Sequence, residues 1–298
     1  NRKNTFLWFH KGKLNTCYNC LDRHVENGKN DKVAIIYDSP ITKTKKQITY
    51  GQLLNKVSAL AASLKKIGVK KGDRVVLYMP MIPEVIISML ACARLGAIHS
   101  VVFGGFAAKE LASRISDVTP KVIISASCGI EPNKIINYKE ILNSALSQTL
   151  HKPVKQIIYQ REQYRCRLDK TNDISWDEFI DFSSKTSCVS VDANDPLYIL
   201  HTSGTTGIPK GIVRTNGGHA VALLNSMKMT YDISENDVFW AASDVGWVVG
   251  HSYIVYAPLL LGCSTVLYEG KPVGTPDAGQ FWRVISEYNV KTMFTAPT

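Results

Sequence analysis

Apolar residues recur along residues 50–67 at the three- and four-residue spacing of an amphipathic helix. Thr49 and Gln52 have the spacing of a capping box at the start of this helix, and Gly68 can end it. The short apolar run at residues 74–79 follows a turn and is bounded by proline, which is typical of a strand. The pattern therefore predicts a helix followed by a strand.

The alternation of helices and apolar strands continues further along the chain. We predict helices at residues 83–95 and 107–115, and strands at residues 97–103 and 121–125. Almost uninterrupted apolar strands between helices are typical of a parallel sheet that is covered on both faces. We therefore expect an α/β fold with a doubly wound parallel sheet, in which ligands bind beyond the carboxyl ends of the strands.

The pattern weakens over residues 131–194, which are more polar and irregular. Within this region, residues 160–165 are typical of an exposed connection, because they are almost all polar or charged. No internal repeat of solenoid period is visible in the sequence. We place a boundary near this region and divide the chain into residues 1–190 and 191–298.

Composition and charge narrow the class of protein. The 298 residues include 35 Lys and Arg against 25 Asp and Glu, a formal charge of +10, and 45% are hydrophobic. These values describe a globular chain and exclude disorder, collagen and coiled coil as global descriptions. Because the positive charges occur in short pairs and not in a block, we expect small anionic substrates or simply a solvated basic surface, with no nucleic-acid partner.

Seven cysteines include one close pair, Cys17 and Cys20. No second pair or histidine pair completes a zinc site, so we interpret the cysteines as reduced thiols and predict no metal site; a redox C-x-x-C motif is the alternative. The longest uncharged stretch, residues 245–268, is interrupted by Gly, Ser, His and Pro. We therefore expect it to form a buried helix–turn–strand segment and not a membrane span.

The most informative segment is T-S-G-T-T-G-I-P-K-G at residues 202–211, which follows an apolar strand. Glycines let backbone N–H groups approach phosphate oxygens, hydroxyls donate hydrogen bonds, and a lysine adds positive charge. The segment is not a Walker A loop, because Pro209 and Gly211 stand where that motif has Gly and Ser or Thr. We predict a different phosphate-binding loop; an ordinary Ser/Thr/Gly-rich surface turn is the alternative.

This loop resembles the signature of the adenylate-forming superfamily, which includes acyl-CoA synthetases, luciferases and the adenylation domains of peptide synthetases. The similarity extends to A-A-S-D-V-G-W-V-V-G-H-S-Y at residues 241–253 and to Y-E-G-K-P at residues 268–272. V-F-G-G-F at residues 102–106 and S-C-G-I-E-P at residues 127–132 are similar to its short-chain acetyl- and propionyl-CoA synthetase branch, especially to the mitochondrial propionyl type. The resemblance covers essentially the whole chain, and it implies the stacked, doubly wound αβαβα sub-domains of the superfamily's N-terminal domain.

The resemblance implies a ligase that uses ATP, Mg²⁺ and coenzyme A. A short carboxylate, propionate or acetate, attacks the α-phosphate of ATP to give acyl-AMP and pyrophosphate, and the thiol of coenzyme A then displaces AMP. The loop would hold the ATP phosphates and stabilise the departing pyrophosphate, with Lys210, Thr205 and Thr206 as its catalytic residues. The implied phosphate-binding residues are Thr202, Ser203, Gly204, Thr205, Thr206, Gly207 and Lys210.

The resemblance also implies sites for the other two substrates. The acyl pocket would consist of Trp247, Val248 and Val249, and the coenzyme A side of Phe103, Gly104, Gly105 and Lys134. Val249 stands where acetate enzymes commonly have Thr, and this favours an extra methylene by about 1 kcal/mol. Glu131 stands where they have Arg, so the expected contact with the coenzyme A phosphate is either lost or made by Lys134 alone. Core packing for Trp247 and a simple turn at Gly104 are the alternatives.

Three further ionisable residues in these motifs receive no catalytic role. A hydrolase motif fails around His251 because Ile254 stands at its second glycine position, so we expect a buried histidine with a local partner. Asp244 and Glu269 are not assigned as bases, because the acid substrate arrives ionised.

The resemblance implies further parts that the 298 residues do not contain: the adenine- and ribose-binding motifs, a motif that helps hold Mg²⁺, and a C-terminal lid domain with a catalytic lysine. We therefore expect an incomplete N-terminal portion with little or no turnover of its own. A truncated, non-catalytic nucleotide-binding or regulatory isoform is one alternative. A relative that only adenylates is another, although the V-F-G-G-F segment counts against it.

The start of the chain lacks Met and an apolar run, so we expect a trimmed start and see no cleavable signal. The basic balance and the similarity to the mitochondrial type indicate the mitochondrial matrix. The cytosol is the alternative, and free cysteines suit both compartments.

Overall fold

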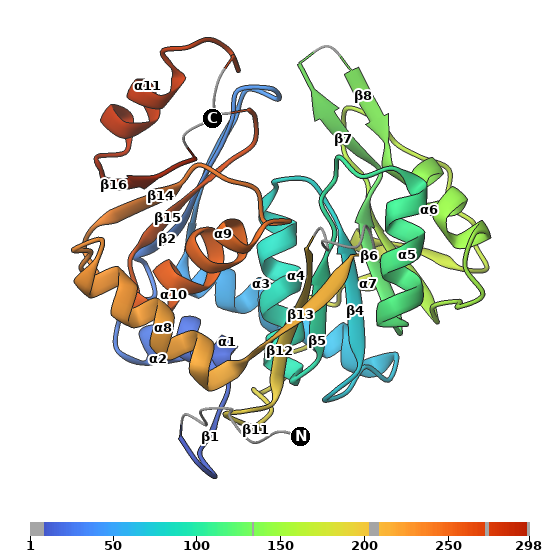
Figure 1. The fold of residues 1–298 in the computed structure, drawn as a ribbon, viewed down its shortest axis with the longest axis horizontal. Coiled ribbons are helices and arrows are strands. Elements are labelled where there is room, and N and C mark those ends of the chain that lie inside the picture. Colours follow the sequence, from blue (N-terminus) through green and yellow to red (C-terminus); the bar gives the residue numbers. More distant parts are fainter. Residues whose placement is uncertain (1–8, 133, 203–208, 272–273, 297–298) are drawn as a thin grey trace.

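The chain folds around two large β-sheets (Figure 1). The computed structural model describes residues 9–132, 134–202, 209–271 and 274–296. In this part of the chain the larger sheet has seven strands, in the order β10 (Asp173–Ser175), β9 (Lys155–Tyr159), β6 (Val122–Ala126), β4 (Arg74–Tyr78), β5 (Ile98–Val101), β12 (Pro196–Thr202) and β13 (Lys210–Thr215). Neighbouring strands are parallel except for β12 and β13, which are antiparallel.

The second sheet has five strands in the order β16 (Val290–Phe294), β14 (Val238–Ala241), β15 (Ser264–Tyr268), β2 (Val33–Ser39) and β3 (Thr44–Thr49). Only β2 and β3 pair antiparallel. Two small antiparallel pairs join β1 (Lys13–Leu14) to β11 (Val191–Asp192) and β7 (Cys128–Glu131) to β8 (Lys134–Asn137). Each large sheet contains strands from both sides of residue 190. The predicted boundary at residue 190 therefore divides the sequence but does not separate the two sheets.

The helices form layers around the sheets. They are α1 (Thr16–Cys20), α2 (Asp22–Glu26), α3 (Tyr50–Lys66), α4 (Pro83–Leu95), α5 (Ala108–Val118), α6 (Tyr138–Ser147), α7 (Trp176–Phe179), α8 (Asn216–Met229), α9 (Val248–Gly250), the π-helix η1 (His251–Tyr256), α10 (Ala257–Leu261) and α11 (Gln280–Glu287). Helices α3 and α4 lie between the two sheets, α5 and α6 cover the outer face of the larger sheet, and α11 covers that of the smaller (Figure 1). This confirms the predicted αβαβα arrangement.

Local signals account for the central helices. In α3, the Thr49 side chain accepts the Gln52 N–H and the Gln52 side chain accepts the Thr49 N–H, so the predicted capping box is confirmed. Helix α4 has the predicted bounds and ends at Gly96, whose φ of 67° is a left-handed conformation that glycine adopts without strain. Both helices bury apolar residues against the two sheets, which explains why they form the middle layer.

The prediction for residues 131–194 is partly wrong. The region contributes β9 and β10 to the larger sheet and α6 to its outer face. Arg161, predicted to lie in an exposed connection, is only 5% exposed because it pairs with Glu269, 108 residues further along the chain. A sequence window cannot show a partner at that distance.

Two other predictions are confirmed. All seven cysteines are free, and Cys17 and Cys20 are buried. Within residues 245–268, α9, η1, α10 and β15 form the expected helix–turn–strand segment, which is largely buried from Gly250 onward, whereas Trp247 and Val248 are exposed. In the described residues, no helix combines the length and the apolar character needed to cross a membrane.

Candidate functional site

The two ends of the predicted phosphate loop lie at the carboxyl edge of the larger sheet. Thr202 is the last residue of β12, and Lys210 pairs with it as the first residue of β13. Both side chains are exposed. The loop therefore joins two antiparallel strands, a hairpin that the sequence did not predict. The predicted residues Ser203, Gly204, Thr205, Thr206 and Gly207 lie outside the described residues.

The predicted coenzyme A segment emerges at the same edge. Strands β5 and β12 are parallel neighbours, with His99 opposite Tyr198. Phe103 lies four residues after His99, and Thr202 lies four residues after Tyr198. The parallel register therefore brings Phe103 and Thr202 to the same carboxyl edge. This is the edge at which ligands bind in doubly wound sheets.

The predicted acyl residue Trp247 contacts this segment through an aromatic cluster. The ring centroids of Trp247 and Phe103 are 5.4 Å apart, and Phe106 lies 5.6 Å from Phe103 and 6.3 Å from Trp247. The guanidinium of Arg114 stacks 4.2 Å from the centre of the Phe106 ring. Trp247 remains 48% exposed, so its indole can still contact a ligand.

Two glycines let these segments approach closely. A Cβ on Gly246 would lie 2.8 Å from the Cα of Phe103, and a Cβ on Gly104 would lie 1.9 Å from the hydroxyl of Tyr138. Either side chain would force its neighbours apart. The glycines therefore have a packing role in addition to the turn that the sequence suggests at Gly104.

A cavity of about 160 Å³ opens between these segments. Its lining includes Phe103, Gly104, Gly105, Glu131, Tyr138, Asp244 and Glu269. Three of the four predicted coenzyme A residues therefore line one cavity. The fourth, Lys134, is exposed at the end of the β7–β8 hairpin, opposite Glu131 and outside this lining. Of the other predicted acyl residues, Val248 is exposed, and Val249 is half-buried against the central core.

The two acidic residues of the cavity differ in their partners. The Glu269 carboxylate pairs with both terminal nitrogens of Arg161, at 2.7 and 3.1 Å, and accepts hydrogen bonds from the hydroxyls of Tyr37 and Ser39 at 2.6 and 2.9 Å. The carboxylate of Asp244 accepts only the N–H of Gly246, at 2.7 Å, among the described residues. Burial raises the pKa of Asp244 to about 6. Glu269 is thus held in a structural network that the sequence did not reveal.

The predicted burial of His251 is confirmed, since its side chain is fully buried. Within the described part of the chain, neither of its ring nitrogens has a hydrogen-bond partner, and the ring packs 4.7 Å from Tyr198 and 5.4 Å from His99. Burial lowers the pKa of His251 to about 4 and that of nearby His219 to about 3. These histidines are neutral core residues that do not line the cavity.

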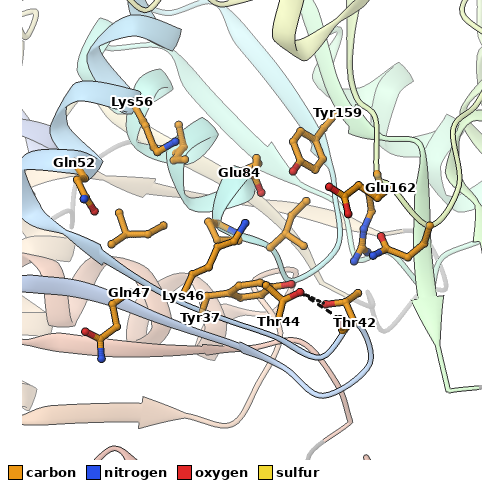
Figure 2. A pocket seen from close by; sticks show the side chains of 16 residues that line it. Tyr37, Thr42, Thr44, Lys46, Gln47, Gln52, Lys56, Glu84, Tyr159 and Glu162 are labelled. Atoms are coloured by element: carbon orange, nitrogen blue, oxygen red, sulfur yellow. Dashed lines mark hydrogen bonds between the residues drawn. The ribbon is translucent and has the colours of Figure 1, made fainter.

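A second, larger cavity of about 530 Å³ lies between the β2–β3 hairpin, α3 and the start of α4 (Figure 2). Its side chains are mixed in charge: Lys46 and Lys56 face Glu84 and Glu162 across the opening (Figure 2). Burial raises the pKa of Glu84. This cavity contains none of the residues that the sequence assigned to a site.

The doubly wound fold and the meeting of the predicted phosphate, acyl and coenzyme A segments at one sheet edge agree with the family that the sequence resembles. The sequence pattern of the family described as AMP-binding enzyme matches residues 21–298, and the chain belongs to this family.

Individual relatives narrow the comparison. "Acyl-CoA synthetase short-chain family member 3, mitochondrial" from Homo sapiens is 57% identical over 292 residues, which cover 98% of this chain and 43% of that protein. "Acyl-CoA synthetase short-chain family member B, mitochondrial" from Dictyostelium discoideum is 46% identical over 98% of this chain and 43% of its own length. "Acetyl-coenzyme A synthetase" from Pasteurella multocida is 43% identical over 98% of this chain and 45% of its own length. The chain thus spans less than half the length of these relatives, and the resemblance to the short-chain branch is confirmed.

Among the described residues, the carboxyl edge contains no cluster of three potential metal-binding side chains. In the described residues, the one cluster of three potential metal-binding groups is Cys17, Asp22 and Cys188, away from this edge. Mg²⁺ prefers oxygen ligands and is commonly held by substrate phosphates with one or two protein groups. Thr202 offers one exposed hydroxyl oxygen at this edge, which fits a Mg²⁺ ion held mainly by phosphate oxygens.

Proposed function

We propose that this chain is the N-terminal part of a short-chain carboxylate–CoA ligase that uses propionate and also acetate. The reaction would convert ATP, the acid and coenzyme A into acyl-CoA, AMP and pyrophosphate through an acyl-adenylate. One observation carries the proposal: the predicted acyl residue Trp247 and the predicted coenzyme A residue Phe103 meet, with ring centroids 5.4 Å apart, at the edge where the phosphate loop begins.

Each predicted segment has a task in this proposal. Lys210 and the hydroxyl and glycine residues of the loop bind the ATP phosphates and stabilise the charge that develops on pyrophosphate. Trp247, Val248 and Val249 limit the length of the acid, and Phe103, Gly104 and Gly105 flank the path of coenzyme A. Lys134, exposed on the β7–β8 hairpin, contacts the coenzyme A phosphate from outside the cavity.

The experiment is carboxylate-dependent exchange of labelled pyrophosphate into ATP, with acetate, propionate and butyrate. It uses the 298-residue chain and a lid-extended chain, in which the sequence of the human relative continues from residue 298 through the adenine- and ribose-binding motifs and the C-terminal lid domain. We expect exchange in the extended chain, strongest with propionate, and a loss of about 100-fold in Lys210→Ala. Lys228→Ala, a charge loss on α8, is the matched control and should retain exchange. Absence of exchange in both folded forms would contradict the proposal.

A non-catalytic nucleotide-binding or regulatory isoform is the second candidate. Equilibrium binding of ATP without exchange in the extended chain would favour it. We place the ligase in the mitochondrial matrix, with the cytosol as the alternative, because the Homo sapiens and Dictyostelium discoideum relatives carry "mitochondrial" in their names.

A further inference from the structure

Asp244 lies where the two predicted substrate paths meet. It is in the turn between β14 and α9, on the wall of the 160 Å³ cavity. Its Oδ1 accepts the N–H of Gly246 at 2.7 Å, and its backbone carbonyl accepts the N–H of Trp247 at 3.0 Å. These two bonds fix the carboxylate in place. Within the described part of the chain, Oδ2 makes no hydrogen bond to protein.

The position of this carboxylate is set by close packing. A Cβ on Gly246 would lie 2.9 Å from the Cβ of Phe103 and 3.1 Å from Oδ1 of Asp244, so the carboxylate and the Phe103 segment approach the same glycine. Three residues after Asp244 comes Trp247, on the acyl side. Asp244 therefore stands between the proposed coenzyme A path and the proposed acyl pocket.

The other ionisable groups on this cavity are unsuited to accept a proton there. Glu269 is held by Arg161, Tyr37 and Ser39. Burial raises the pKa of Tyr138 well above its ordinary value, so its hydroxyl keeps its proton. Glu131 and Lys271 are exposed at the opening. Among these groups, Asp244 is the half-buried carboxylate with a free oxygen in the described structure.

The proposed reaction contains one step that needs a base. The acid substrate is ionised in solution, but an ordinary thiol, with a pKa of about 8.5, is mostly protonated at neutral pH. Burial raises the pKa of Asp244 to about 6, which makes it a stronger base than an ordinary carboxylate while it stays mostly ionised at pH 7.

We propose that Asp244 is the general base that accepts the proton of the coenzyme A thiol when the sulfur attacks the acyl-adenylate. This inference rests on the proposed function. In the step, the S–H bond breaks and its proton moves to Asp244, while a C–S bond forms at the acyl carbon. The C–O bond to AMP breaks, AMP leaves with that electron pair, and Asp244 then returns its proton to water through the open cavity.

The experiment measures thioester formation from preformed propionyl-adenylate and coenzyme A, in the lid-extended chain. General-base catalysis contributes about 10²- to 10⁴-fold, so Asp244→Asn should slow this step by at least about 100-fold. Pyrophosphate exchange should fall far less, because it involves no thiol. The wild-type rate should fall as pH drops below about 6, the pKa of Asp244, and Asp244→Asn should lose this limb.

Two controls separate a base from a structural residue. Asp232→Asn makes the same chemical change at a side chain that is 95% exposed and should leave both rates unchanged. A coenzyme A analogue with a more acidic thiol should recover much of the rate in Asp244→Asn, because it needs less help in losing its proton. An equal loss in both half-reactions, a retained pH limb, or no recovery with the acidic thiol would overturn the role of Asp244.

The preformed adenylate also separates this inference from the proposed function. If exchange is absent but thioester formation depends on Asp244 as described, adenylation has been misassigned and the base stands. If exchange is present and thioester formation ignores Asp244, the base is wrong and the adenylating function stands. Absence of both in the folded wild-type chain overturns both.

Discussion

Two cavities lie on either side of one buried ion pair. Arg161 lines the larger cavity of about 530 Å³, and its partner Glu269 lines the smaller one of about 160 Å³. The larger cavity is built from β2, β3, α3 and α4, and its lysines and glutamates offset one another. The smaller cavity is lined by three of the predicted coenzyme A residues, Phe103, Gly104 and Gly105. The proposed site therefore rests on the convergence of chemically distinct segments at a carboxyl edge and not on cavity volume.

The largest expected effect comes from breaking the buried Arg161–Glu269 ion pair that lies between the two cavities. Glu269→Ala leaves the buried guanidinium of Arg161 without its partner, which should lower the free energy of unfolding by about 3–5 kcal/mol. Urea unfolding measures it. Glu131→Ala, an exposed acid on the same cavity, is the control and should change stability by less than about 0.5 kcal/mol.

A second pair of substitutions tests whether the penalty comes from the unpaired charge. Replacing both partners, with Arg161→Met and Glu269→Leu, should recover much of the lost stability because no buried charge remains. If Glu269→Ala lowers the free energy of unfolding no more than Glu131→Ala does, the ion pair between the two cavities does not stabilise the fold.

A smaller effect is expected from overpacking the close contact between Gly246 and Phe103, beside the smaller cavity. Gly246→Ala places a Cβ 2.8 Å from the Cα of Phe103, and such overpacking should cost about 1–3 kcal/mol in unfolding free energy. It should also lower thioester formation, since it displaces Phe103 or Asp244. Gly279→Ala is the control: its Cβ would meet only the side chain of Asp277, at 3.1 Å, which can move. Equal stability of the two variants would contradict the close packing.

The smallest effect concerns Glu84 in the larger cavity. Because burial raises its pKa, the folded state binds a proton more tightly than the unfolded state, so its contribution to stability falls as pH rises from the ordinary pKa of Glu to the raised value. Glu84→Gln should remove this dependence and stabilise the fold at neutral pH, because no buried carboxylate remains to be ionised. Unfolding measured from pH 4 to 8 checks the slope. Both half-reactions should be unchanged, and a loss of activity would assign chemistry to this cavity.

The elements that sequence predicts are those with local causes. Helix α3 carries its own capping box and α4 has Pro83 at its start and Gly96 at its end, so their bounds follow from nearby residues. The burial of Arg161 escapes prediction because its partner lies 108 residues away. The segment at residues 250–253 suggests a local partner for His251, whereas tertiary packing buries this ring against β5 and β12.

In the candidate site, too, the sequence identifies the residues, whereas only the fold brings them together. Motifs that resemble the family single out Phe103 and Trp247, but no residue pattern places them 5.4 Å apart; the parallel register of β5 and β12 and the turn after β14 do so. Sequence alone gives Asp244 no role, because the acid substrate needs no base. Its burial and its position on the cavity, which come from the fold, point to the thiol instead.

The central claim is that substrates occupy the smaller cavity and its edge. Hydrogen–deuterium exchange of the lid-extended chain, with and without ATP, propionate and coenzyme A, tests it most directly. We predict protection in peptides that cover residues 101–106 and 244–250, and none in residues 42–56 or 159–163. Protection confined to residues 42–56 and 159–163 would place the ligands in the larger cavity and contradict the account.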